Sequence, residues 1–138
     1  MAVFTKTLAR NSTAGTDIFD ITEDVQLAVA DSGMSAGVAT VFVPGSTGAL
    51  TTVEYEPGLV HDITAFFERI IPRDMEYGHE QMWHDGNGHS HVRASLLGPS
   101  LAIPFLKGSL TLGTWQQVIL VDFDNKPRER RFIVQITG

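Results

Sequence analysis

The alternation of apolar and polar positions predicts strands at both ends of the chain, with helices between them. Residues 2–8 alternate well enough for an opening strand, and residues 37–43 (GVATVFV) are rich in β-branched side chains, as is typical of a central strand. From residue 100 onward, runs dense in Ile, Val, Leu and Phe are separated by short turns. These runs predict an antiparallel meander with at least one face covered by helices.

Helical signals occur at three places. Thr22 is a good N-cap residue, and the two acidic residues after it favour the positive end of a helix running to about residue 32. A first-turn proline predicts a second helix over residues 57–71, and residues 91–97 predict a short third helix closed by Gly98. The second helix has an apolar stripe formed by Leu59, Ile63, Phe66, Phe67 and Ile70. We expect one α+β domain over residues 1–138, with antiparallel sheets, two main helices and one short helix.

Charge and composition narrow the class of protein. The formal net charge is −6, and no Lys/Arg cluster is dense enough to neutralise a phosphate backbone, so no nucleic-acid partner is expected. The absence of cysteine excludes disulfides and thiolate metal sites. No apolar run approaches the length of a membrane span, and the N-terminal residues lack the apolar core of a signal peptide. We therefore expect a cytoplasmic protein without a membrane partner.

The segment 77–98 carries the strongest chemical signal. It contains four of the five histidines of the chain, namely His79, His84, His89 and His91. Neutral imidazole is a common metal ligand, so we expect a divalent metal, with zinc or nickel favoured. Glu80, Asp85 and Asn87 lie between the histidines and can also ligate a metal.

Individual histidines of this segment have alternative interpretations. His89 and His91 are two residues apart, so an extended backbone would project both toward one face. His84 follows Trp83 and has packing as its alternative role. For the cluster as a whole, the alternative to a functional metal site is a purely structural role.

Two carboxylates are candidates for a catalytic role. Asp62 borders the apolar stripe of the second predicted helix, where it is either a solvent-facing charge or a partly buried acid with a partner. Glu54 lies near the end of a predicted strand and is either a site residue or a solvent-facing charge at the strand edge.

Other residues are candidates for binding an anion. The turn 44–48 contains two glycines, and Ser46 and Thr47 add hydroxyl donors, although the pattern is also that of a simple tight turn. Arg93 and Ser95 lie in the first turns of the short predicted helix, where free N–H groups favour anions.

Several stretches resemble the YjbQ family. The run from Val92 to Asp124 resembles it, together with GHSH before this run and RERRFIV after it. The stretch 40–62 (TVFVPGSTGALTTVEYEPGLVHD) also resembles the strand–turn–strand–helix segment of the family. The most specific parts are the blocks 91–98 (HVRASLLG) and 113–116 (GTWQ).

The resemblance implies a small α+β protein that assembles as a homotrimer, with a site near the subunit boundary. Glu54, Asp62, His79 and His91 match residues of the family pattern. Many relatives carry a histidine followed by two hydroxyl residues in the turn, whereas this chain has Gly45, Ser46 and Thr47. Either His84 or His89 replaces the missing histidine, or the metal geometry differs.

The resemblance also implies secondary thiamine phosphate synthase activity, a transferase reaction. A pyrimidine methyl diphosphate is joined to a thiazole phosphate with release of pyrophosphate. In that reaction the metal (zinc or nickel, with Mg²⁺ as an alternative on the diphosphate) and Arg93 would hold the leaving group, with Glu54 or Asp62 near the pyrimidine. A metal-dependent phosphohydrolase and a non-catalytic metal- or metabolite-binding module remain alternatives.

Overall fold

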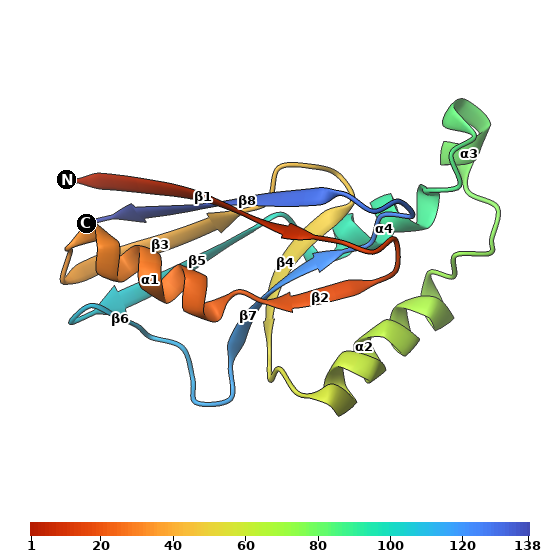
Figure 1. Cartoon of the computed structure of the whole chain (residues 1–138). Coiled ribbons are helices and arrows are strands. Elements are labelled where there is room, and N and C mark those ends of the chain that lie inside the picture. The colour runs from red at the N-terminus through yellow and green to blue at the C-terminus, as the bar shows by residue number, and fades with distance from the viewer.

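Two antiparallel sheets and four helices form a layered α+β structure in the computed structural model, which describes residues 1–138 (Figure 1). The strands are β1 (Val3–Asn11), β2 (Asp17–Asp20), β3 (Ala36–Phe42), β4 (Gly48–Val53), β5 (Ser100–Leu106), β6 (Ser109–Leu110), β7 (Gln117–Asp122) and β8 (Glu129–Thr137). The helices are α1 (Thr22–Ser32), α2 (Pro57–Ile70), α3 (Gly78–Trp83) and α4 (Gly88–Leu97). The predicted fold class is confirmed, although four helices are present instead of three.

The larger sheet has the strand order β1-β8-β3-β5-β6, and the smaller sheet has the order β2-β7-β4. All strand pairs are antiparallel. The predicted meander is wrong, because β7 belongs to the smaller sheet and β8 lies between β1 and β3. The pattern of burial explains the difference. Strand β7 is apolar on both faces and needs cover on both sides, whereas β8 alternates between buried and exposed residues.

The smaller sheet is the middle layer of the protein. One of its faces, which includes Val118 and Leu120, joins α1 and the inner face of the larger sheet in the main core. The opposite face, which includes Ile119 and Val121, packs against Phe67 of α2 and residues of α4 in a second core. This arrangement holds α4 on the edge strand β4, beside the turn that precedes that strand.

The helix boundaries follow local signals. Helix α1 begins at Thr22 and ends before Gly33, which has a φ of 70°. Helix α2 begins with Pro57, and the carboxylate of Glu56 accepts hydrogen bonds from the backbone N–H groups of Gly58 and Leu59. Both helices were predicted, and α3 was not. The expected N-cap role of Thr22 is wrong, because Ile21 occupies the N-cap position and the Thr22 hydroxyl instead accepts from the N–H of Val118. No helix of the structure is long and apolar enough to cross a membrane.

Candidate metal centre

The segment between α3 and α4 is a tight connection that places the His-rich residues. The backbone of His84 is left-handed, with a φ of 52°, and its N–H donates to the carbonyl of Glu80, which ends α3. Asn87 then precedes α4, whose first residue is Gly88. A Cβ at Gly88 would lie 2.5 Å from the Cβ of Tyr77, so only glycine permits this close approach.

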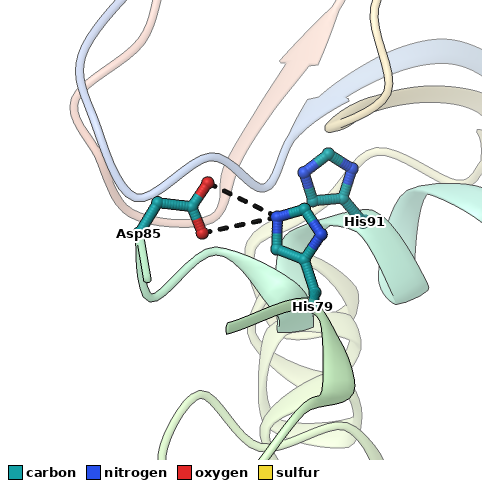
Figure 2. A group of neighbouring side chains, drawn as sticks. All are labelled: His79, Asp85 and His91. Carbon is teal, nitrogen blue, oxygen red and sulfur yellow. Dashed lines mark hydrogen bonds and ion pairs between the residues drawn. The ribbon is translucent and has the colours of Figure 1, made fainter. Parts of the chain in front are cut away.

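His79, Asp85 and His91 converge at this connection (Figure 2). One ligand atom from each residue lies within 4.8 Å of the others. Nε2 of His79 is 3.4 Å from both carboxylate oxygens of Asp85, and the rings of His79 and His91 are 4.3 Å apart between centroids. Ligand atoms around a tetrahedral zinc ion are about 3.3 Å apart, as follows from its bond lengths. Small side-chain rotations would therefore suffice for the three residues to share one ion.

Asp85 is held in place by neighbouring backbone and side chains. Its carboxylate accepts a hydrogen bond from the N–H of Asn87, and its carbonyl accepts one from the Asn125 side chain. The Asn87 side chain in turn accepts from the N–H of Asn125, in the turn after β7. These hydrogen bonds join the connection between α3 and α4 to the turn that follows β7 of the smaller sheet. The carboxylate is therefore oriented before any ligand arrives.

The electrostatics of this group favour ligand forms that bind metals. Partial burial, followed by the nearby His79, lowers the pKa of His91, so its ring is neutral at neutral pH. Desolvation alone would raise the pKa of Asp85, but the N–H of Asn87 and the His79 ring together lower it, so the carboxylate is ionised. Metal ions bind these deprotonated forms.

Only two of the four histidines of the segment, His79 and His91, belong to the candidate metal-binding group. His84 is exposed at the left-handed position and lies outside the group. His89 is 2% exposed, and α4 begins before it, so His89 and His91 project from opposite sides of a helix instead of one side of an extended strand. Nε2 of His89 lies 3.2 Å from the Ser90 hydroxyl, while its Nδ1 is buried without a partner. Neither residue is placed to replace the missing histidine.

Acid is expected to lower the stability of the metal-free protein. Burial lowers the pKa of His89 and of His91 in the folded state. The histidines of the unfolded chain have ordinary pKa values near 6.5. As the pH falls, the unfolded chain therefore binds more protons than the folded protein does. The contribution of these two neutral histidines to the free energy of unfolding should be fully present above about pH 6.5 and should decrease below it. Urea unfolding in the presence of a chelator, at neutral and mildly acidic pH, checks this; equal midpoints would contradict it.

Arg93 has a structural role in the observed arrangement. Its side chain is 3% exposed, donates twice to the carbonyl of Ile71 and pairs with Glu68 at 2.8 Å. A third nitrogen lies 3.3 Å from the hydroxyl of Thr16. The hydrogen bond from Arg93 lowers the pKa of Glu68. Since its nitrogens are engaged, Arg93 joins α4 to the end of α2 and is not directed at the His–Asp group.

The turn 44–48 shares a cavity with His91 of the metal group. Gly45, Ser46 and His91 are among the residues that line one cavity of about 380 Å³, and Ser95 lines it from α4. Thr47 is 4% exposed, and its hydroxyl donates to Asp124 and accepts from Arg130. The structure therefore brings Ser46 and Ser95 together with His91, whereas the Thr47 hydroxyl is used internally.

The two carboxylate candidates lie apart from this cavity. Glu54 is exposed after β4. The side chain of Asp62 is 75% exposed, lies 3.5 Å from His61 and lines a separate, mainly apolar cavity of about 410 Å³ beside α2. The interpretation of Asp62 as a partly buried acid is wrong for this chain, because α2 turns that position outward.

Two functional candidates were not selected from the sequence. Asp85 was one of three residues between the histidines with ligating atoms, and only the left-handed turn at His84 brings it to His79. Arg130 and Arg131 are adjacent in the last strand, so they point to opposite faces, and the sequence alone does not say which of them is buried. The burial pattern of β8 places Arg130 inside, 4% exposed, and its neighbour Arg131 outside.

The fold and the His–Asp group define a small α+β protein with a candidate metal centre between two helices. A family model described as UPF0047 protein YjbQ-like matches residues 6–138. The chain therefore belongs to the YjbQ-like, or UPF0047, family, and the predicted family is confirmed.

The relatives cover nearly the whole chain. It is 38% identical over 138 residues to a UPF0047 protein of Methanothermobacter thermautotrophicus, a match covering 100% of this chain and 94% of that protein. A YbjQ-like protein of unknown function from Sulfolobus solfataricus has a solved structure with a TM-score of 0.94, 31% identity and coverage of 99% and 98% of the two chains. The solved structure of a YjbQ/UPF0047 family protein of Clostridium acetobutylicum has a TM-score of 0.84 and 36% identity, and the match covers 97% of this chain and 99% of that chain.

Proposed function

We propose that this chain is a divalent-metal-dependent enzyme that acts on a phosphorylated heterocycle. The observation that carries the proposal is the convergence of His79, Asp85 and His91 within 4.8 Å. Two imidazoles and one carboxylate form a donor set that suits zinc or nickel. Three protein ligands also leave a coordination position free, as in catalytic rather than structural zinc sites.

The cavity beside His91 supports a small-molecule substrate. Its volume of about 380 Å³ lies within the range of ligand sites, and its walls contain serine hydroxyls and backbone groups. A bound metal would supply a Lewis acid that neutralises charge on a phosphate leaving group. His79, Asp85 and His91 would hold the metal, and Ser46 and Ser95 would contact the substrate.

Within this class, the resemblance to secondary thiamine phosphate synthases favours transfer of a pyrimidinylmethyl group from its diphosphate to the ring nitrogen of a thiazole phosphate, with release of pyrophosphate. Such a reaction needs little covalent chemistry from the protein and depends on position and charge stabilisation. Mg²⁺ accompanying a diphosphate substrate fits the same proposal. Glu54 and Asp62 lie outside the cavity, so a role for them near the pyrimidine would require a partner subunit or a large ligand.

A metal-dependent phosphohydrolase is the second candidate. The free coordination position favours it, because a metal held by His79, Asp85 and His91 would activate water as a nucleophile near neutral pH. The two activities differ in their requirement for a second substrate. Release of pyrophosphate only when both heterocycles are present supports the transferase, and release of phosphate from one heterocycle alone supports the hydrolase.

Metal content is the direct test of the proposal. Protein purified without a histidine tag, stripped with a chelator and then reloaded, is expected to bind about one zinc or nickel ion per chain, as a single three-ligand site implies. Elemental analysis after gel filtration measures the ratio. If no transition ion is retained at about micromolar free metal, the metal-dependent enzyme is excluded.

We also propose a cytoplasmic homotrimer with sites near the subunit boundaries. The outer face of the larger sheet exposes apolar side chains, among them Val38 and Phe42 of β3 and Leu106 of β5. Apolar side chains exposed on one face of a sheet favour association between copies. Light scattering at about micromolar protein is expected to give three times the chain mass. A monomer or dimer mass would rule out the trimer.

A further inference from the structure

The cavity beside His91 has two walls of different character. One wall is the turn before β4 and the other is one side of α4. The residues that line it are Gly45, Ser46, Gly48, His91, Ala94, Ser95 and Pro99. None of them carries a negative charge, and His91 brings the candidate metal centre to the edge of the cavity.

Arg130 lies directly against the turn of this cavity. It is 4% exposed, its Nε donates to Asp122 at 2.8 Å, and its Nη2 donates to the Thr47 hydroxyl at 2.6 Å. Its Nη1 donates no hydrogen bond to the protein and is not among the atoms sealed from solvent. That nitrogen lies 2.6 Å from the position that a Cβ of Gly45 would occupy. A free guanidinium donor therefore lies against the turn at Gly45, although Arg130 itself is not among the residues that line the cavity.

The turn itself offers further donors. The backbone N–H groups of Gly45, Ser46 and Thr47 make no hydrogen bond within the protein. Consecutive free N–H groups in a turn are a common way in which proteins bind anions. The Ser46 hydroxyl, which is exposed, adds one more donor to the same wall.

Gly45 distinguishes this cavity from one built around a third histidine. A side chain at this position would meet the Arg130 guanidinium, because the Cβ position and Nη1 are only 2.6 Å apart. The turn of this chain is thus bordered by a permanent cation, which cannot ligate a metal but can hold an anion. Asp122 and Asp124 balance the charges of Arg130 and Arg128. The attraction of Arg130 for an anion therefore comes from the short charge-assisted hydrogen bond that its free Nη1 can donate, and not from a net positive charge.

We propose that the cavity between the turn 44–48 and α4 binds the phosphoryl group of the ligand. Arg130 Nη1 and the N–H groups of the turn hold its oxygens on one side, and the metal centre at His91 lies on the other. The contribution of the metal rests on the proposed function. The contribution of the turn and Arg130 does not.

Phosphate titrations of charge-reversal variants test the proposal. Ser46→Asp and Ser95→Glu each place a carboxylate in the cavity at an exposed position, so both proteins should fold. Ser109→Glu adds the same charge at an exposed site on β6, at the end of the protein away from α4 (Figure 1). Inorganic phosphate and pyrophosphate are titrated calorimetrically into zinc-loaded and metal-free protein. Melting temperature and zinc content are measured for every variant.

The expected result is that Ser46→Asp and Ser95→Glu weaken phosphate binding by at least about tenfold, about 1.4 kcal/mol, while Ser109→Glu does not change it. If zinc binds but phosphate does not bind below about 10 mM, the subsite is refuted and the metal centre stands. Equal phosphate affinity in all four proteins also refutes it. If zinc fails to bind but phosphate binding still depends on Ser46 and Ser95, the subsite is supported and the metal-dependent enzyme is not.

Discussion

Replacement of His91 by alanine is expected to weaken zinc binding by more than about 100-fold, which exceeds the loss usual for residues behind the ligands. His91 supplies one of three converging ligand atoms, and the two that remain cannot enclose an ion. The protein should stay folded, because the His91 ring makes no hydrogen bond within the protein. Competition with a zinc-binding dye measures the affinity, and circular dichroism measures the melting temperature.

Two other histidines provide matched controls for this experiment. His61→Ala removes a side chain that is 80% exposed on α2, and it should change neither affinity nor stability. His89→Ala should do the opposite of His91→Ala: zinc affinity is retained, and the melting temperature falls because a buried ring is lost. Loss of zinc binding in His89→Ala, with normal affinity in His91→Ala, would exchange the two assignments.

Replacement of Arg130 by methionine is expected to destabilise the protein by about 3–5 kcal/mol, the usual cost of removing one partner of a buried ion pair. Arg130 and Asp122 are 4% and 0% exposed at the side chain, and their closest atoms are 2.8 Å apart. Without the guanidinium, Asp122 stays buried as an uncompensated charge, and the Thr47 hydroxyl loses a donor. Urea unfolding measures the free energy.

The neighbouring arginine serves as the control for that substitution. Arg131 has a side chain that is 69% exposed and pairs only with the exposed Glu129, so Arg131→Met should cost less than about 1 kcal/mol. In the double variant Arg130→Met with Asp122→Asn, part of the lost stability should return, because no unpaired charge remains. If Arg130→Met were as stable as Arg131→Met, the buried network would have no role in stability.

The parts of the fold that were predicted correctly are those determined by local signals. Pro57 and the apolar stripe of α2, Gly33 after α1, and the β-branched run of β3 each act within a few residues. The pairing of β7 with β2 and β4 depends on contacts between distant segments, and no local pattern determines it. Short helix α3 lacks any buried residue, so it leaves no apolar periodicity to detect.

The candidate site was predicted in part for a related reason. The density of histidines marked the segment, and the structure brings His79 and His91 together. The choice among the remaining residues depended on backbone geometry. An extended chain would pair His89 with His91, whereas a helix beginning at Gly88 separates them, and a single left-handed residue at His84 brings in Asp85 instead.

The closeness of the three ligands along the chain affects how metal and folding are linked. His79, Asp85 and His91 lie within one short segment, so the unfolded chain can also chelate an ion, though with less order. A ligand that binds both states stabilises the folded one only by the ratio of its two affinities. Saturating zinc should therefore raise the melting temperature less than its affinity for the native protein implies. If the proposed site binds a metal, the same proximity would let a nascent chain chelate the ion before the sheets have formed.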